Sequence, residues 1–283
     1  MTEARPLPFG TSPVPSDSLE MERRITRLLE SLAQPGVRGL DGVKVAVEID
    51  GPDLASLRVD ATGVSVQDPG ASARSLPVGP ADVVRREPGT VRSLEVVGHP
   101  VTVRGLPAQV DVAASGVGFD WVVGADGQLY VEVRPPSDAA PAVGTGRVAV
   151  AHRALVAAVE AALGELLQDK GFTLTGLELD LQNRGPRALD VRADAKIKRS
   201  FLRAGVTVTA SASIDRSLVL EIGDVAISSS NPVVDGLIGP FRSRVAAEAG
   251  RTIDLAAQLP PGVRVSDVSI EAGDDVVVSV TLG

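Results

Sequence analysis

Hydrophobic and polar residues alternate with a period of two along most of the chain. The pattern is clearest at residues 43–49, 189–198, 206–214 and 276–282. Strict alternation predicts antiparallel strands with one covered face, because the strands of a parallel sheet are apolar on both faces. The pattern therefore disfavours a Rossmann fold or a TIM barrel.

Three segments change to the period of an amphipathic helix. Asp17 and Glu20 form a capping box at the start of the first, which ends before Pro35. The second spans about residues 151–168, and the third spans about 231–250. We therefore expect three helices among ten to twelve strands.

So many strands exceed what a strongly twisted open sheet carries without curling or splitting. The sequence predicts an α+β fold in which a strongly curved antiparallel sheet is rolled around long amphipathic helices, built from one unit or from two helix-plus-sheet halves. Residues 1–16 read as a disordered, proline-rich tail and residues 17–283 as a single roll, with a possible seam at 135–150. Its interior is either a filled core or an aliphatic tube.

Composition removes several classes of function. With 36 acidic and 28 basic residues the net charge is -8, which disfavours nucleic acid as a partner. The absence of cysteine removes thiolate chemistry, and His99 and His152 alone cannot supply a histidine-rich metal site. We expect no metal, no cofactor and no catalytic residues.

The segments 185–191, 231–234, 250–255, 259–263 and 268–274 together resemble one family of actinobacterial domains, the LmeA-like phospholipid-binding proteins. The resemblance covers the chain from about residue 170 to its end. It implies a tubular lipid-binding fold similar to that of bactericidal permeability-increasing protein, with an apolar groove and no enzymatic activity.

Two groups of residues are candidates for contact with a lipid. Acyl chains would meet the stripes of the second and third helices, formed by Leu155, Val159, Leu163, Leu166, Val234, Leu237, Ile238, Phe241 and Val245. Guanidinium groups suit a phosphate, so an anionic headgroup would meet Arg187, Arg199 and Arg203. The same helix stripes fit a filled core, and the same arginines fit a solvated strand surface.

The sequence therefore predicts non-enzymatic binding of phospholipid acyl chains in an aliphatic cavity, as a carrier or sensor. The alternative is a structural or protein-interaction module with a filled core, and a hydrolase is a third reading without a supporting motif. No apolar run is long enough for a membrane span, and the first eighteen residues do not resemble a signal peptide. We expect a cytoplasmic protein, or one of the cell envelope if a leader precedes this sequence.

Overall fold

The structure is a computed structural model that describes residues 6–31, 36–67, 79–80, 82–168, 171–199, 202–229, 250–258 and 263–283. The chain divides into two compact units. The first contains Met1–Val148, Pro260–Asp267 and Val280–Gly283, and the second contains Ala149–Leu259 and Val268–Ser279.

The prediction of a sheet rolled around long amphipathic helices is wrong. Strands hold 63% of the described residues and helices only 15%. The described elements include two α-helices, of 14 and 17 residues, a large mixed sheet and a separate antiparallel sheet. Alternation fixes the two faces of a strand but not its neighbours, so it did not reveal the parallel pairing of residues 57–60 with residues 94–97.

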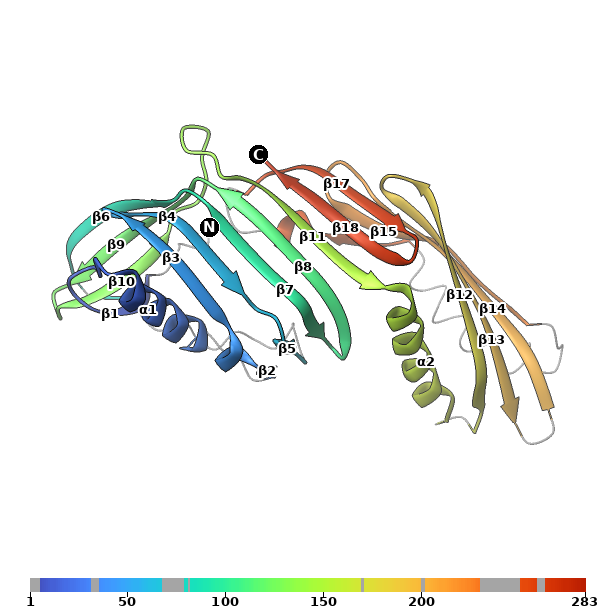
Figure 1. The fold of residues 1–283 in the computed structure, drawn as a ribbon. Helices are drawn as coiled ribbons and strands as arrows, with labels where there is room; N and C mark the ends of the chain where they lie inside the picture. Colours follow the sequence, from blue (N-terminus) through green and yellow to red (C-terminus); the bar gives the residue numbers. More distant parts are fainter. Residues whose placement is uncertain are drawn as a thin grey trace. The chain divides into compact units, whose positions relative to one another are not determined.

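The first unit is a mixed sheet with one α-helix. Its sheet runs in the order β1-β10-β9-β6-β4-β7-β8-β11, with β3 also paired to β4 (Figure 1). The elements are β1 (Leu7–Thr11), α1 (Ser18–Ser31), β2 (Val37–Arg38), η1 (Leu40–Gly42), β3 (Lys44–Asp50), β4 (Asp53–Asp60), β5 (Ser65–Val66), β6 (Val83–Val91), β7 (Leu94–Val103), β8 (Leu106–Ser115), β9 (Val117–Gly124), β10 (Gln128–Val133) and β11 (Val143–Ala151).

Helix α1 begins where the capping box places it. The backbone N–H of Glu20 donates to Asp17 Oδ2 at 2.9 Å, so the predicted N-cap is confirmed. The helix packs against β3 and β1 and buries Met21 and Ile25. They belong to a core that contains Trp121. The centroid of its ring lies 5.1 Å from that of Phe9 and 4.9 Å from that of Phe119. Three aromatic side chains therefore form part of the buried core of this unit.

The second unit contains an antiparallel sheet of five strands, in the order β12-β13-β14-β15-β16. Its elements are α2 (His152–Gln168), β12 (Thr173–Gly185), β13 (Ala188–Arg199), β14 (Leu202–Ile214), β15 (Val219–Ser229), β16 (Arg251–Asp254) and η2 (Ala256–Gln258). Strands β11, β17 (Val265–Ala272) and β18 (Asp275–Leu282) contribute residues to both units.

Helix α2 confirms the second predicted helix. It ends where Gly171, with a φ of 73°, donates its backbone N–H to the carbonyl of Gln168 at 2.9 Å. The helix packs against β12. The third predicted helix, at about 231–250, lies outside the described residues apart from Gly250. Within the described ranges, no helix is long and apolar enough to cross a membrane.

Candidate functional site

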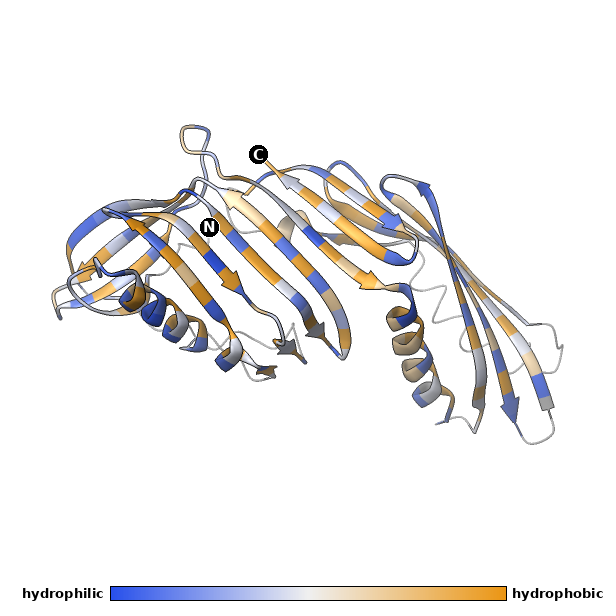
Figure 2. Cartoon of the chain, viewed as in Figure 1, coloured by the Kyte–Doolittle hydropathy of each residue, from blue (hydrophilic) through white to orange (hydrophobic). Residues whose placement is uncertain are grey.

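The five-stranded sheet of the second unit presents one continuous aliphatic face. Cross-strand partners share a face, so the register of β12 to β15 places these side chains in rows across the strands. Figure 2 shows the resulting alternation of orange and blue along each strand. The rows, here called the aliphatic face, are Leu177, Ala195 and Val206; Leu179, Ala193, Val208 and Ile227; Leu181, Val191 and Ala210; and Leu189, Ala212 and Ile222.

Most of the aliphatic face is only half-buried. On β14, Val206 and Val208 fall in the same half-buried range as Thr207 and Thr209, which point to the opposite face. A face that closes a filled core is normally far more buried than the polar face behind it. Among the described residues of β12 to β15, the buried apolar side chains are Leu189 and Ile214 near one end of the strands and Ile197 near the other.

Helix α2 supplies the apolar side chains that the sequence predicts for contact with a lipid. Leu155, Val159 and Leu163 form a half-buried stripe. Near the end of the helix, Leu167 packs against the cluster around Ile197. The side chain of Leu166 is outside the described part, as are Val234, Leu237, Ile238, Phe241 and Val245.

The three arginines predicted to hold a headgroup do not form one site. Arg187 precedes β13, is half-buried and donates from Nε to the carbonyl of Val268 at 3.1 Å. Arg199 lies at the other end of the strand, about 40 Å away along the backbone. It stacks over the ring of Phe172 at 5.2 Å, and Arg203 follows on β14. Only Arg199 and Arg203 share one end of the sheet.

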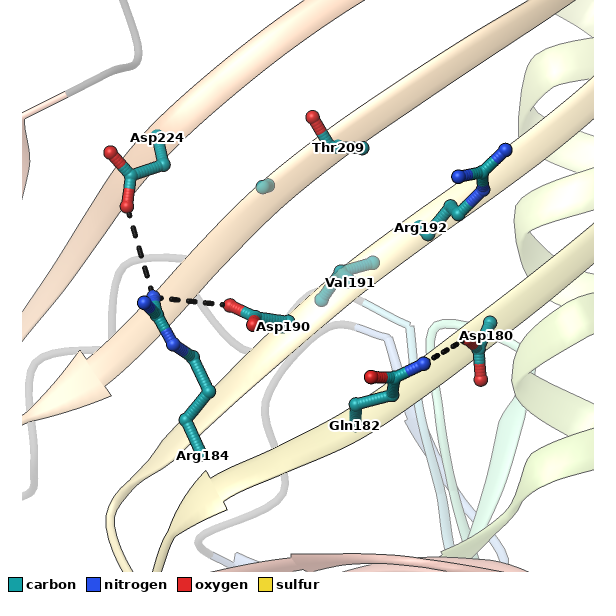
Figure 3. A pocket seen from close by; sticks show the side chains of 9 residues that line it. Asp180, Gln182, Arg184, Asp190, Val191, Arg192, Thr209 and Asp224 are labelled. Carbon is teal, nitrogen blue, oxygen red and sulfur yellow. Dashed lines mark hydrogen bonds and ion pairs between the residues drawn. The ribbon is translucent and has the colours of Figure 1, made fainter.

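The opposite face of the same sheet carries a polar hollow of about 430 Å³. Figure 3 shows Arg184 between two carboxylates, Asp190 at 3.3 Å and Asp224 at 3.8 Å. Next to them, the Nε of Arg192 donates to Asp194 at 2.8 Å, a hydrogen bond that lowers the pKa of Asp194 and raises that of Arg192. Carboxylates thus pair with both arginines, and the described lining of the hollow offers an anion no unpaired cation.

Both histidines have structural partners. His152 begins α2, where its backbone N–H donates to the carbonyl of Asp274 and its Nε2 lies 3.0 Å from the carbonyl oxygen of Leu179. These contacts tie the start of the helix to the turn between β17 and β18 and to β12. His99 lies on the surface of the first unit, with Nε2 2.7 Å from Asp111 Oδ1. Among the described residues, no group of three or more histidines, aspartates or glutamates could hold a metal ion.

An ion-pair network around the buried Asp120 lies in the first unit and has no counterpart in the sequence prediction. Asp120 is 8% exposed and contacts Arg86 Nη1 at 3.0 Å and Arg134 Nε at 3.3 Å. Hydrogen bonds to Asp120 and Glu132 raise the pKa of Arg86. The network joins β6, β9 and β10, so its effect is on stability. Asp120 follows Phe119 in the nearly continuous buried run of β9. Its position among apolar residues was the one feature of the sequence that could have indicated a buried carboxylate.

The comparisons with known proteins identify no relative. No protein-family model, no curated protein and no solved structure matches the chain. The resemblance to LmeA-like proteins therefore stays a prediction.

Proposed function

We propose that the second unit binds the acyl chain of a lipid along the aliphatic face, next to α2. One observation carries this proposal. Val206 and Val208 of β14 fall in the same half-buried range as the threonines behind them, although they belong to a continuous apolar surface across four strands. Contiguous apolar side chains that stay partly accessible are characteristic of ligand-binding and interaction surfaces.

The dimensions and energetics suit a long apolar chain. The rows from Leu189 to Ala195 follow β13 for about 20 Å. Each methylene group that leaves water contributes about 0.8 kcal/mol. Ten buried methylene groups would therefore contribute roughly 8 kcal/mol before the cost of ordering the chain is subtracted. Binding needs no catalytic group and no metal.

Native mass spectrometry of protein purified without detergent tests the proposal directly. We expect an added mass that organic extraction and lipid analysis assign to a phospholipid or a fatty acid. A protein that stays bare after incubation with lipid vesicles would contradict the proposal. That result would favour a structural or protein-interaction module.

A pair of substitutions tests the position of the site. Ala193→Phe adds an aromatic ring in the middle of the aliphatic face, whereas Ala226→Phe adds it at an exposed position on the opposite face. We expect Ala193→Phe to weaken binding of a fluorescent fatty acid at least about tenfold, since the ring occupies the space of several methylene groups. Ala226→Phe should leave the affinity unchanged.

The stability of the same variants separates a groove from a filled core. In a groove the added ring meets solvent or ligand, so the free energy of unfolding should change by less than about 1 kcal/mol. In a filled core, overpacking at Ala193 would cost about 1–3 kcal/mol. A large destabilisation by Ala193→Phe, with no fatty-acid binding by the unmodified protein, would refute the proposed site.

A further inference from the structure

We propose that the end of the five-stranded sheet formed by Lys196, Lys198, Arg199 and Arg203, here called the basic end, docks on an anionic membrane surface. These residues lie at the end of β13 and the start of β14. All four are exposed. The proposal rests on the lipid-binding function for its purpose, because docking would bring the aliphatic face to a source of lipid.

The charges of the basic end are close together. Lys198 and Arg203 are direct cross-strand partners, and Lys196 is two residues away from Lys198 on the same face. Like charges directly opposite each other destabilise a sheet. The pair is thus an arrangement that a counter-charge from outside the protein would stabilise.

The described part of the chain supplies little counter-charge. Lys196 lies 3.7 Å from Glu178, and both side chains are strongly exposed. No described carboxylate forms an ion pair with Lys198, Arg199 or Arg203. The chain as a whole has a net charge of -8, so the basic end differs in sign from the protein that carries it. Long-range repulsion would orient this end toward an anionic surface.

The geometry fits a plane better than a single phosphate. Lys196, Lys198 and Arg203 project from the polar face of the sheet, whereas Arg199 shares the face of Ile197 and covers Phe172. Side chains on opposite faces cannot converge on one phosphate group. Long basic side chains around the end of a sheet can all reach a flat layer of headgroups, because they extend along apolar surface toward the interface.

The basic end also borders the aliphatic face. Arg199 lies two residues beyond Ile197, whose cluster includes Leu174, Val206 and Leu167 of α2. A lipid leaving the membrane at this end would therefore meet a guanidinium group first and aliphatic side chains next. That order matches the order of headgroup and acyl chain in a phospholipid.

Co-sedimentation with vesicles tests the docking surface. The full-length protein is mixed with vesicles of phosphatidylcholine that contain either no anionic lipid or a fraction of phosphatidylglycerol. We expect binding to the anionic vesicles only, weakening as salt is added. One basic side chain near an anionic surface contributes about fivefold in affinity, so the double variant Lys198→Glu/Arg203→Glu should bind at least about 25-fold more weakly.

The matched control is Lys44→Glu/Arg216→Glu, which changes the net charge equally. Lys44 is exposed on β3, and Arg216 is exposed in the turn between β14 and β15, at the opposite end of the sheet. The control should bind about as well as the unmodified protein, and circular dichroism verifies that both variants fold. Equal loss in the two variants, equal binding to neutral and anionic vesicles, or no vesicle binding would overturn the proposal.

A fluorescent fatty acid in vesicle-free solution distinguishes the two proposals. A protein that binds the fatty acid but not anionic vesicles retains the lipid-binding function and loses the docking surface. A protein that binds anionic vesicles through the basic end but takes up no fatty acid retains the docking surface and loses the lipid-binding function.

Discussion

The two units use the same alternation of apolar and polar residues but fill their interiors differently. In the first unit, Met21 and Leu129 are fully buried and the rings of Phe9, Phe119 and Trp121 meet in one cluster. In the second unit, the corresponding sheet face carries valine, alanine and leucine, most of them half-buried. Large aromatic side chains close the space between a sheet and its helix, and small aliphatic side chains leave more of it open.

Under the proposed function, this difference assigns stability mainly to the first unit and lipid binding to the second. A packed core makes every methylene group costly to remove, because the surroundings relax only partly. A half-buried apolar face contributes less to folding, and under the proposed function its remaining surface is available to a ligand. Substitutions in the two units should therefore differ in their cost to stability.

Truncation of a core side chain should give the largest difference in stability between the two units. We expect Leu129→Ala to lower the free energy of unfolding of the first unit by about 2–5 kcal/mol, since Leu129 is 0% exposed. Ile227→Ala on the half-buried face of the second unit should cost less than about 1.5 kcal/mol. Hydrogen exchange during chemical denaturation measures the loss of unfolding free energy in each variant. The fluorescence of Trp121, the single tryptophan, reports on the first unit. Equal costs would mean that both units have packed cores.

The ion pairs around Asp120 should make the next largest contribution to the stability of the first unit. Asp120→Asn keeps the shape of the side chain but leaves Arg134 without its carboxylate, and Arg86 retains only Glu132. We expect a loss of about 1–3 kcal/mol in the first unit. Asp111→Asn is the control, because its contacts with His99 and Arg147 are exposed and should be worth under about 1 kcal/mol. If the two variants cost the same, Asp120 acts like a surface residue.

The contacts at the starts of the two helices should each contribute a similar, smaller amount to the free energy of unfolding. Asp17→Ala removes the N-cap of α1 and should cost the first unit about 1 kcal/mol. His152→Ala removes the contact between its ring and the carbonyl of Leu179, and we expect about 0.5–1.5 kcal/mol in the second unit. Hydrogen exchange within α1 and α2 reports each loss. Increased exchange in the helix that was not changed would show that the units do not respond separately.

The sequence was informative where the cause of a structure is local. Asp17, Glu20 and Gly171 mark helix ends through contacts within four residues, and the alternation at 43–49 and 206–214 marks β3 and β14. It was uninformative where the cause is a contact between distant segments. The parallel pairing of β4 with β7 and the arginines around Asp120 depend on which strands become neighbours.

The candidate site shows the same limit. Periodicity identifies Leu155, Val159 and Leu163 as one stripe, and the structure finds them half-buried on α2. It could not tell that Arg187 and Arg199 lie at opposite ends of β13, because both belong to one basic stretch of sequence. The burial of the aliphatic face depends on which segments pack against it, which alternation does not determine.

The smallest expected effect is the acid sensitivity of the second unit. Two hydrogen bonds lower the pKa of Asp194 below its ordinary value of 3.8. The one from Arg192 has the larger effect, and the one from Thr207 has the smaller effect. As the pH falls below 3.8, the unfolded chain takes up a proton before the folded protein does, so stability falls until the pH passes the lowered pKa. The contribution is complete above the ordinary pKa. It is small because Asp194 and Arg192 are solvated.

The variant Asp194→Asn tests this contribution. Between pH 5 and pH 2, roughly the range in which carboxylates titrate, its Tm should change less than the Tm of the unmodified protein. Glu221→Gln, at an exposed carboxylate of β15, is the control and should follow the unmodified protein. Parallel profiles for all three proteins would show that the contact between Arg192 and Asp194 contributes nothing to the stability of the fold.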